Sequence, residues 1–312
     1  MHDMWEPDPL ITIVTPCLNA ARFLEQAILS VLEQDYPRIE YLVMDGGSTD
    51  GTLDILRKYD HALRWYSAPD RGTPDAVNRG FALGQGEILG FLNADDRYYP
   101  GAVSTAVQHL LENPDHSGVY GDAWWIDANG ARIAPYPVRD FDRVLLEREC
   151  FICQPASFFR REPFENAGGL DPNLNLTFDY DFWLRFTRTY TLGRTDSTLA
   201  DSRMHHANKS LSQREGVFRE TFKILKRDCG YVPFHWIYGY LCFLADGRDQ
   251  FFEPFRPSIP SYVESLPLGL WTNPGAMGRY VSEWASAISW AAVRRQLTTG
   301  QPIQSPTAPP NE

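Results

Sequence analysis

Acidic side chains follow two short apolar runs in the first third of the chain. Asp45 comes after the run Glu40–Met44, and the pair Asp95 and Asp96 comes after the run Glu87–Asn93. Adjacent carboxylates repel each other unless water or a cation screens them. Oxygen ligands suit Mg²⁺ or Mn²⁺, and an ion with few protein ligands usually takes phosphates into its shell. These residues indicate either a metal-assisted phosphate site or a solvated polar turn.

Two further groups of polar residues lie in the middle of the chain. Asp179 and Asp181 stand near the start of an expected helix over 179–188, where they could act chemically or only cap the helix. Aromatic residues surround them, and an aromatic face can stack on a nucleobase or a sugar. His205 and His206 could supply a metal ligand or a phosphate contact, although adjacent histidines are more often surface or core residues.

The elements that position these residues alternate between strand and helix. Apolar runs predict strands at residues 10–15, 40–44, 63–67 and 87–93, and helical spacing predicts helices near 23–32, 53–56 and 75–83. Such alternation is typical of a mostly parallel sheet covered by helices on both faces. Ligands of these sheets bind beyond the carboxyl ends of the strands. The four strand ends are therefore expected to form one site.

The first strand end excludes two common nucleotide-binding classes. Residues 16–19 read Pro-Cys-Leu-Asn, where a dinucleotide site would need G-x-G-x-x-G and a Walker loop would need G-x-x-x-x-G-K-[ST]. Asn19 is expected to cap the following helix, and Asp50 to cap the next one. Asp45 precedes two glycines, so it could accept hydrogen bonds from a nucleobase or ribose, or simply belong to a turn.

The ordered set of motifs resembles the inverting nucleotide-sugar glycosyltransferases of family 2. The resemblance covers roughly residues 10–215, whereas the last third of the chain has no comparable match. The matching segments are Ile13–Asn19 (IVTPCLN), Val43–Thr52 (VMDGGSTDGT), Asp70–Gly80 (DRGTPDAVNRG), Gly90–Asp96 (GFLNADD), Gln154–Phe159 (QPASFF), Gly168–Asp171 (GGLD) and Asp179–Arg185 (DYDFWLR).

The resemblance implies an α/β GT-A fold, which is Rossmann-like, with a helical C-terminal extension. It implies that Asp179 is the catalytic base, with Asp181 as second choice, and that Asp95 binds Mn²⁺ or Mg²⁺, with His205 as a looser match. The residues implied to bind the nucleotide sugar are Thr15, Pro16, Asn19, Asp45, Arg71, Asn93 and Ala94. Two positions depart from the family pattern, because Asn93 replaces the first acid of the D-x-D motif and Phe178 replaces a glutamate.

The activity implied by this resemblance is metal-assisted transfer of a sugar from a nucleoside-diphosphate sugar, with a UDP-sugar as the expected donor. The acceptor would be a hydroxyl of a saccharide or lipid-linked molecule in polysaccharide or glycoconjugate synthesis. A nucleotidyltransferase would need a glycine- and arginine-rich loop after the first strand. Residues 16–19 read Pro-Cys-Leu-Asn instead, which argues against that class of enzyme. A catalytically degenerate, saccharide-binding subunit of a glycan assembly system is the alternative that the two departures leave open.

Composition narrows the partners and the compartment. The chain has 312 residues and a formal net charge of −11, which argues against nucleic acid as a partner. No signal peptide or apolar span is visible, so we expect a cytoplasmic protein, with the inner face of the membrane left open. Cys150 and Cys153 form a C-x-x-C pair without a second pair, which is more typical of buried thiols than of a zinc site.

Three segments are expected along the chain. Residues 1–214 form the glycosyltransferase domain, residues 215–297 a helical extension, and residues 298–312 a disordered tail that is rich in Pro, Gln, Thr and Ser. The extension contains many aromatic residues. They could cap the domain, cover the acceptor, form a homodimer or contact a membrane. The aromatic residues in question are Trp236, Tyr238, Tyr240, Phe243, Phe251 and Phe252.

Overall fold

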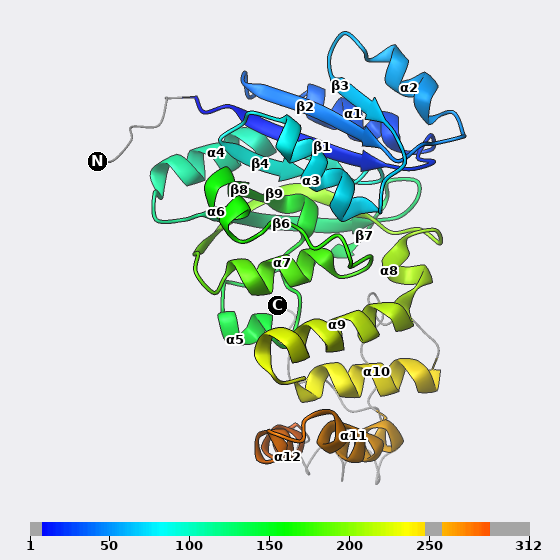
Figure 1. Ribbon diagram of the computed structural model, residues 1–312, viewed down its shortest axis with the longest axis vertical. Helices are drawn as coiled ribbons and strands as arrows, with labels where there is room; N and C mark the ends of the chain where they lie inside the picture. Colours follow the sequence, from blue (N-terminus) through cyan, green and yellow to red (C-terminus); the bar gives the residue numbers. More distant parts are fainter. Residues whose placement is uncertain (1–7, 247–257, 288–312) are drawn as a thin grey trace. The chain divides into compact units, whose positions relative to one another are not determined.

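The structure is a computed structural model that describes residues 8–246 and 258–287. It divides into two compact units (Figure 1). Unit 1 holds residues 1–146 and 150–208, and unit 2 holds residues 147–149 and 209–312. The division falls a few residues before the expected boundary at 214/215. The expected disordered tail, 298–312, lies outside the described residues, as do Phe251 and Phe252.

Unit 1 is built on a nine-stranded mixed sheet with the order β3-β2-β1-β4-β8-β6-β9-β5, and β7 pairs with β6. The first four strands are parallel, as the alternating pattern predicts, whereas β8, β7 and β5 pair antiparallel with their neighbours. The strands are β1 (Ile11–Cys17), β2 (Ile39–Asp45), β3 (Arg64–Ser67), β4 (Ile88–Phe91), β5 (Arg97–Tyr98), β6 (Gly118–Ile126), β7 (Arg132–Pro135), β8 (Ser157–Arg160) and β9 (Leu192–Arg203).

Helices cover both faces of this sheet. One core joins β1 and β2 to apolar residues of three helices, among them Ile28, Leu56 and Val107. The opposite face carries aromatic residues, where Phe159 of β8 packs against Phe182 at a ring-centroid distance of 5.4 Å. The helices of unit 1 are α1 (Leu24–Leu32), α2 (Thr52–Lys58), α3 (Thr73–Leu83), α4 (Ala102–Glu112), α5 (Arg143–Leu146), α6 (Arg161–Asn166) and α7 (Phe178–Phe186), with a short 3₁₀ turn at Gln154–Ala156.

Glycine allows the close approach of α3 to the sheet. A Cβ atom at Gly80 would lie 2.6 Å from a methyl carbon of Val14, so any larger residue would push the helix away. The approach matters because the loop that precedes α3 carries Asp70 and Arg71. Tight packing of α3 on β1 and β2 thus places this loop beside the ends of those strands.

Both capping predictions need correction. Phe23 is the N-cap residue of α1, and the side chain of Asn19 instead accepts a hydrogen bond from the Thr49 amide at 2.9 Å. Gly51 is the N-cap residue of α2, and Asp50, one position earlier, accepts from the Thr52 amide at 2.9 Å. Asn19 therefore ties the first loop to the second.

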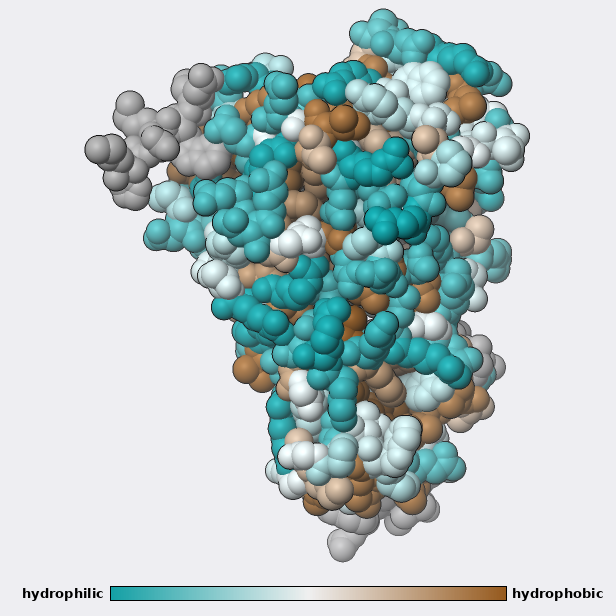
Figure 2. Space-filling view, viewed as in Figure 1, coloured by the Kyte–Doolittle hydropathy of each residue, from teal (hydrophilic) through white to brown (hydrophobic). Residues whose placement is uncertain are grey.

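Unit 2 is helical, and its interior is rich in aromatic residues. Its helices are α8 (Lys209–Ser212), α9 (Arg214–Cys229), α10 (Phe234–Asp246), α11 (Ile259–Thr272) and α12 (Met277–Ser286). Tyr262 of α11 stacks on Trp284 of α12 at 4.5 Å, and Phe234 of α10 stacks on Tyr238 at 5.3 Å. Apolar and hydrophilic residues alternate over its visible surface (Figure 2). Among residues 8–246 and 258–287, no helix is both long and apolar enough to cross a bilayer.

Candidate active site

The parallel register brings the ends of the first strands to one edge of the sheet. Cys17 of β1 pairs with Asp45 of β2, Asp45 pairs with Ser67 of β3, and Val14 of β1 pairs with Phe91 of β4. The loops that follow these strands contain most of the residues expected to bind a nucleotide sugar. The sheet topology therefore gathers these residues as the strand-end rule predicts.

Asp45 is buried and held by several hydrogen bonds from its own turn and from the end of β3. Its carboxylate accepts from the amides of Gly47 at 3.1 Å and Ser48 at 3.0 Å, from the Ser67 hydroxyl at 2.6 Å, and from the Ser48 hydroxyl. Burial acts to raise the pKa of Asp45, but the hydrogen bonds from Ser48, Ser67 and the two amides outweigh it and lower the pKa. Asp45 is thus a fixed anion at the end of β2.

The first loop contributes backbone and one side chain to this edge. Asn19 adopts a left-handed conformation with φ 51°, and its amide donates to the Ser48 hydroxyl at 2.7 Å. Pro16 is buried. The hydroxyl of Thr15 lies inside the fold, 2.9 Å from the Tyr41 hydroxyl, and Thr15 is fully buried. The Thr15 side chain is therefore already engaged, which leaves its backbone as the part that could border a ligand.

The loop after β3 brings a carboxylate close to the Asp45 turn. Asp70 accepts a hydrogen bond from the Gly72 amide at 2.8 Å, and a Cβ atom at Gly46 would lie 2.9 Å from its Oδ2. The neighbouring Arg71 is largely exposed and pairs with Asp75 at 2.9 Å. The sequence singled out Arg71, whereas in the structure Asp70 lies against the second loop and Arg71 pairs with Asp75. The acidic residue type of Asp70 at a strand end was the signal for it.

The turn after β4 is organised by a glutamine from a distant segment. Gln154 donates to the Phe91 carbonyl at 2.7 Å and accepts from Asn93 Nδ2 at 2.9 Å. Asn93 also donates to Asp96 at 3.1 Å. Ala94, the residue that follows Asn93, is buried. Gln154 was part of a motif but had no assigned role, and its 61-residue separation from Asn93 gave the sequence no means of pairing them.

Asp96 is the buried member of the aspartate pair. It is 4% exposed and accepts from the Arg203 amide at 2.8 Å. Burial, followed by the charge of Asp95, raises its pKa well above the ordinary value, against the opposing hydrogen bonds from Arg203 and Asn93. Asp96 therefore supports the turn from inside the protein.

Asp95 faces a histidine that comes from the end of β9. The distance between Asp95 Oδ2 and His205 Nε2 is 3.0 Å. Arg203 fixes this junction, because its Nε donates to the Asp95 carbonyl at 2.7 Å and its guanidinium lies 4.7 Å from the centre of the Phe23 ring. The His205 ring also packs on Phe23 at 4.9 Å. Asp95 and His205, the residues expected to bind the metal, thus lie together although 110 positions separate them in the sequence.

One carboxylate and one imidazole fit a divalent cation only in part. Among the described residues there is no group of three or more His, Cys, Asp or Glu side chains that could hold a metal ion. Mg²⁺ in particular is commonly held by one or two carboxylates together with substrate phosphates. The donor set of Asp95 and His205 fits such an ion when phosphate oxygens complete the shell.

The two acids of α7 have different surroundings. Asp181 is fully buried and pairs with Arg185 at 2.9 Å, and Arg185 also donates to the Gly169 carbonyl at 2.7 Å. Asp179 is half-buried, and its carboxylate accepts from the Tyr180 amide at 2.8 Å. Because Asp181 is held in a buried ion pair, Asp179 is the acid of this helix that can better meet a ligand.

The start of α7 lies near the end of β4. The ring of Phe178 is 6.4 Å from that of Phe91, the last residue of β4. Burial, then the charges of Asp96 and Cys150, and to a smaller extent that of Asp179, raise the pKa of Cys153. Cys153 is buried and Cys150 half-buried, and the Cys150 thiol donates to the Ile152 carbonyl at 3.8 Å. The interpretation as a buried thiol holds for Cys153, whereas Cys150 is only half-buried.

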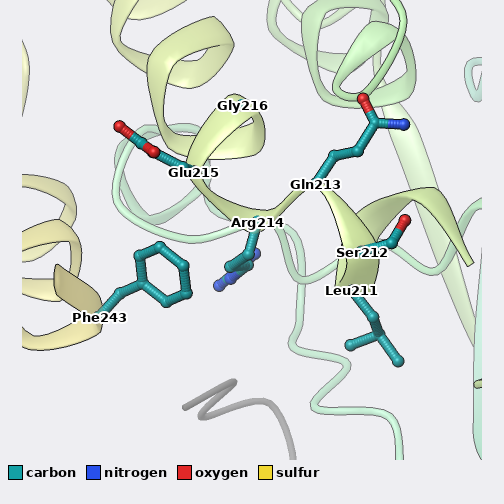
Figure 3. A pocket seen from close by; sticks show the side chains of 7 residues that line it. All are labelled: Leu211, Ser212, Gln213, Arg214, Glu215, Gly216 and Phe243. Atoms are coloured by element: carbon teal, nitrogen blue, oxygen red, sulfur yellow. The ribbon is translucent and has the colours of Figure 1, made fainter. Parts of the chain in front are cut away.

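A separate hollow of about 310 Å³ lies within unit 2. It is formed by the turn between α8 and α9 together with Phe243 of α10 (Figure 3). None of the expected site residues lines it. The candidate site is therefore the loop edge of unit 1 and not this hollow.

Comparison with known proteins identifies the family to which these loops belong. The profile described as glycosyl transferase family 2 matches residues 12–168. An uncharacterized glycosyltransferase of Rickettsia typhi is 30% identical over 226 residues, which cover 66% of this chain and 69% of that protein. A Mycobacterium tuberculosis protein named PGL/p-HBAD biosynthesis glycosyltransferase is 34% identical over 182 residues, 57% of this chain and 69% of that protein. The match spans only 34% of a similar Rickettsia felis protein.

Solved structures share the fold at low sequence identity. TarS of S. aureus, residues 1–349 in complex with UDP-GlcNAc, superposes with a TM-score of 0.61 at 14% identity, covering 94% of this chain and 92% of that one. A mannosyltransferase from Pyrobaculum calidifontis in complex with GDP-Man and Mn²⁺ gives a TM-score of 0.57 at 19% identity, covering 95% and 81%. The fold is therefore that of the GT-A glycosyltransferases, as expected. The chain belongs to glycosyl transferase family 2 and is a glycosyltransferase.

Proposed function

We propose that the chain transfers a sugar, with inversion, from a nucleoside-diphosphate sugar to a hydroxyl acceptor in polysaccharide or glycoconjugate synthesis. The observation that carries this proposal is the convergence at one sheet edge of the Asp45 turn, the Asn93–Asp96 turn and the start of α7. A fixed anion, a potential metal pair and a half-buried acid come from three separate loops. This arrangement supplies separate places for a nucleoside, a diphosphate and an acceptor.

The nucleoside end of the donor is assigned to the first three loops. Asp45 stays ionised because its hydrogen bonds lower its pKa, and an anion is a strong acceptor for a nucleobase or ribose donor. Asn19, Pro16 and the Thr15 backbone border the same edge, and Asp70 and Arg71 line its third loop. Asn93 is held by Gln154 in the place where a ribose hydroxyl could be met. A UDP-sugar is the proposed donor.

The diphosphate end is assigned to Asp95 and His205. When bound there, Mn²⁺ or Mg²⁺ would supply positive charge beside the departing nucleoside diphosphate. Arg203 holds the Asp95 backbone and, through Phe23, the position of the His205 ring. The solved mannosyltransferase with GDP-Man and Mn²⁺ has this fold and supports the choice of a divalent ion.

The acceptor is assigned to the side of Asp179. Its carboxylate takes the proton of the acceptor hydroxyl while the acceptor oxygen attacks the anomeric carbon from the face opposite the nucleotide. The new glycosidic bond forms as the bond from the anomeric carbon to the phosphate oxygen breaks, and the nucleoside diphosphate leaves with the bonding electrons. The ion pair of Asp181 with Arg185 keeps that second acid out of this role.

Release of nucleoside diphosphate from a panel of UDP-, GDP- and dTDP-sugars, with Mn²⁺, Mg²⁺ or EDTA, tests the proposal. We expect turnover of one donor class with metal and its loss with EDTA. Calorimetry with the same donors accompanies the assay. The absence of both turnover and binding for every donor would contradict the enzymatic proposal and favour the degenerate, saccharide-binding alternative, whereas donor binding without turnover would mean that the required acceptor is missing from the assay.

A further inference from the structure

Helix α11 of unit 2 is apolar on nearly its whole circumference. Glu264 is the single charged residue among its 14 positions. One side of the helix packs on α12, where the Tyr280 hydroxyl donates to the Ser265 carbonyl at 2.8 Å. At Gly269 a Cβ atom would lie 1.9 Å from the Tyr280 ring, so the two helices are in close contact. This side of α11 is therefore fully used inside unit 2.

The opposite side of α11 carries apolar residues that face solvent. Val263, Pro267 and Trp271 are spaced four positions apart, which places them along one side of the helix, and we call them the α11 stripe. Val263 is 58% exposed and Trp271 79%, the largest exposure among the big hydrophobic side chains of the described residues. These side chains form one group on one side of a helix, unlike the singly scattered apolar residues that are normal on a protein surface.

Basic side chains of α9 adjoin one end of the stripe. The Lys226 ammonium donates to the Thr272 carbonyl, directly after Trp271. Lys223 is exposed one helical turn before Lys226. Tryptophan and lysine side chains are both suited to the boundary between a membrane and water, because each has an apolar body and a polar tip.

The charge of unit 2 permits approach to an anionic surface. Its described residues contain eight Lys or Arg and eight Asp or Glu, although the whole chain carries a net charge of −11. The acidic excess therefore lies outside this part of the chain. A lysine pair on a neutral unit is attracted to anionic lipid, whereas an acidic unit would be repelled.

The size of the stripe selects among the partners it could have. A helix of 14 residues is about 21 Å long. A stripe about 10 Å wide along it offers roughly 200 Å², well below the roughly 800 Å² that each partner buries in a stable protein interface. A bilayer has no such threshold, because each apolar side chain that enters it contributes separately. The stripe alone is thus too small to hold a second copy but suited to a bilayer.

The helix also sets the depth of binding. Fourteen residues are too few to cross a bilayer, which needs about 20. Pro267 has no N–H, so it cannot donate to the Val263 carbonyl on the stripe, and that carbonyl needs water or a headgroup. We propose that the α11 stripe, with Lys223 and Lys226, docks unit 2 on an anionic bilayer at the level of the headgroups.

Flotation of the full chain with vesicles tests the proposal without any assay of sugar transfer. One set of vesicles is pure phosphatidylcholine, and the other contains roughly 30% phosphatidylglycerol, which supplies the anionic surface that attracts basic segments. We expect binding to the anionic vesicles and a loss of about tenfold or more in the double variant Val263→Ser/Trp271→Ser. Lys223→Gln and Lys226→Gln should each weaken binding to anionic vesicles about fivefold.

A matched control separates the stripe from general surface hydrophobicity. Ile133 of β7 is 43% exposed in unit 1, and Ile133→Ser should leave vesicle binding unchanged. Thermal unfolding of every variant confirms folding, which exposed substitutions should not disturb. Equal binding of the wild type and the double variant would overturn the proposal. So would a dimer in light scattering that Trp271→Ser dissociates without any vesicle binding, since that result would assign the stripe to a second copy.

Discussion

The turn after β2 and the turn after β4 each contain one buried aspartate, and the two carboxylates are held in opposite ways. Asp45 and Asp96 are 3% and 4% exposed. Hydrogen bonds from two hydroxyls and two amides lower the pKa of Asp45 against its burial, whereas burial and the charge of Asp95 raise the pKa of Asp96. Both side chains are nearly inaccessible to solvent, but the Asp96 carboxyl lies deeper in the protein and beside the charge of Asp95, whereas the Asp45 carboxylate has more hydrogen-bond donors around it. These differences together give the two pKa shifts their opposite directions.

This difference indicates a division of roles along the sheet edge. The β2 turn presents a permanent negative charge with fixed geometry. The β4 turn keeps Asp96 as an internal support and exposes Asp95 to His205. Asp179, half-buried at the start of α7, is neither a fixed anion like Asp45 nor an internal support like Asp96. Five substitutions test these roles, and Asp179→Asn is expected to have the largest effect.

Asp179→Asn should reduce kcat by roughly 10²–10⁴-fold, because a positioned general base contributes about that much. Donor binding should persist, since the change leaves the β2 turn intact. Steady-state turnover together with calorimetry of the donor measures both quantities. Asp54→Asn, at an exposed acid of α2, is the control and should be fully active. A variant Asp179→Asn with normal kcat would move the base elsewhere.

Asp95→Asn and His205→Gln should each raise the Mn²⁺ concentration for half-maximal turnover at least about tenfold, since changes even in residues that support metal ligands cost 10–100-fold. A titration of activity against Mn²⁺ measures this. His61→Gln, at an exposed histidine of unit 1, serves as the comparison and should behave like the wild type. An unchanged Mn²⁺ dependence in both site variants would show that the pair is not a ligand set.

Asp45→Asn should lower the free energy of unfolding by about 2–3 kcal/mol at pH 7. The amide would turn a donor toward the Ser48 and Gly47 amides and lose charge-assisted hydrogen bonds. Urea unfolding followed by circular dichroism gives the difference. A loss below about 0.5 kcal/mol would mean that the hydrogen bonds of this turn contribute little.

The same variant has a defined pH dependence. The pKa of Asp45 is lowered in the folded state, so its contribution to stability is present above the unfolded pKa of about 3.9 and is lost as the pH falls through the folded pKa. The stability difference between wild type and Asp45→Asn should therefore shrink as the pH falls below about 4. A difference that stays constant down to pH 2 would contradict this assignment.

Asp96→Asn should have the smallest effect, less than about 1 kcal/mol on the free energy of unfolding at pH 7. Burial already disfavours the charged carboxylate, and asparagine keeps an acceptor for the Arg203 amide. Unfolding of Asp96→Asn beside Asp45→Asn, under identical conditions, compares the two turns directly. A larger loss for Asp96→Asn than for Asp45→Asn would mean that the β4 turn depends more on its charged carboxylate than the β2 turn does.

The sequence by itself determined the local elements and their order. Apolar runs and helical spacing predicted the first four strands and the helices between them, because these signals depend on near neighbours in the chain. The strand-end rule then placed Asp45 and the Asn93–Asp96 turn at one edge, and the register of β1, β2 and β4 has them there. Capping was wrong at Asn19, whose partner Thr49 is 30 residues away.

Only the tertiary structure decided which polar groups meet. Gln154 with Asn93, His205 with Asp95 and Arg203 with the Asp95 carbonyl are joined across 61 to 110 positions. Asp181, unlike Asp179, is held in an ion pair with Arg185, and the position of Arg185 depends on its hydrogen bond to the Gly169 carbonyl. Residue type shows that a side chain can bind a proton or a metal. Burial and distant partners set its charge and orientation, and these follow from packing of the whole sheet.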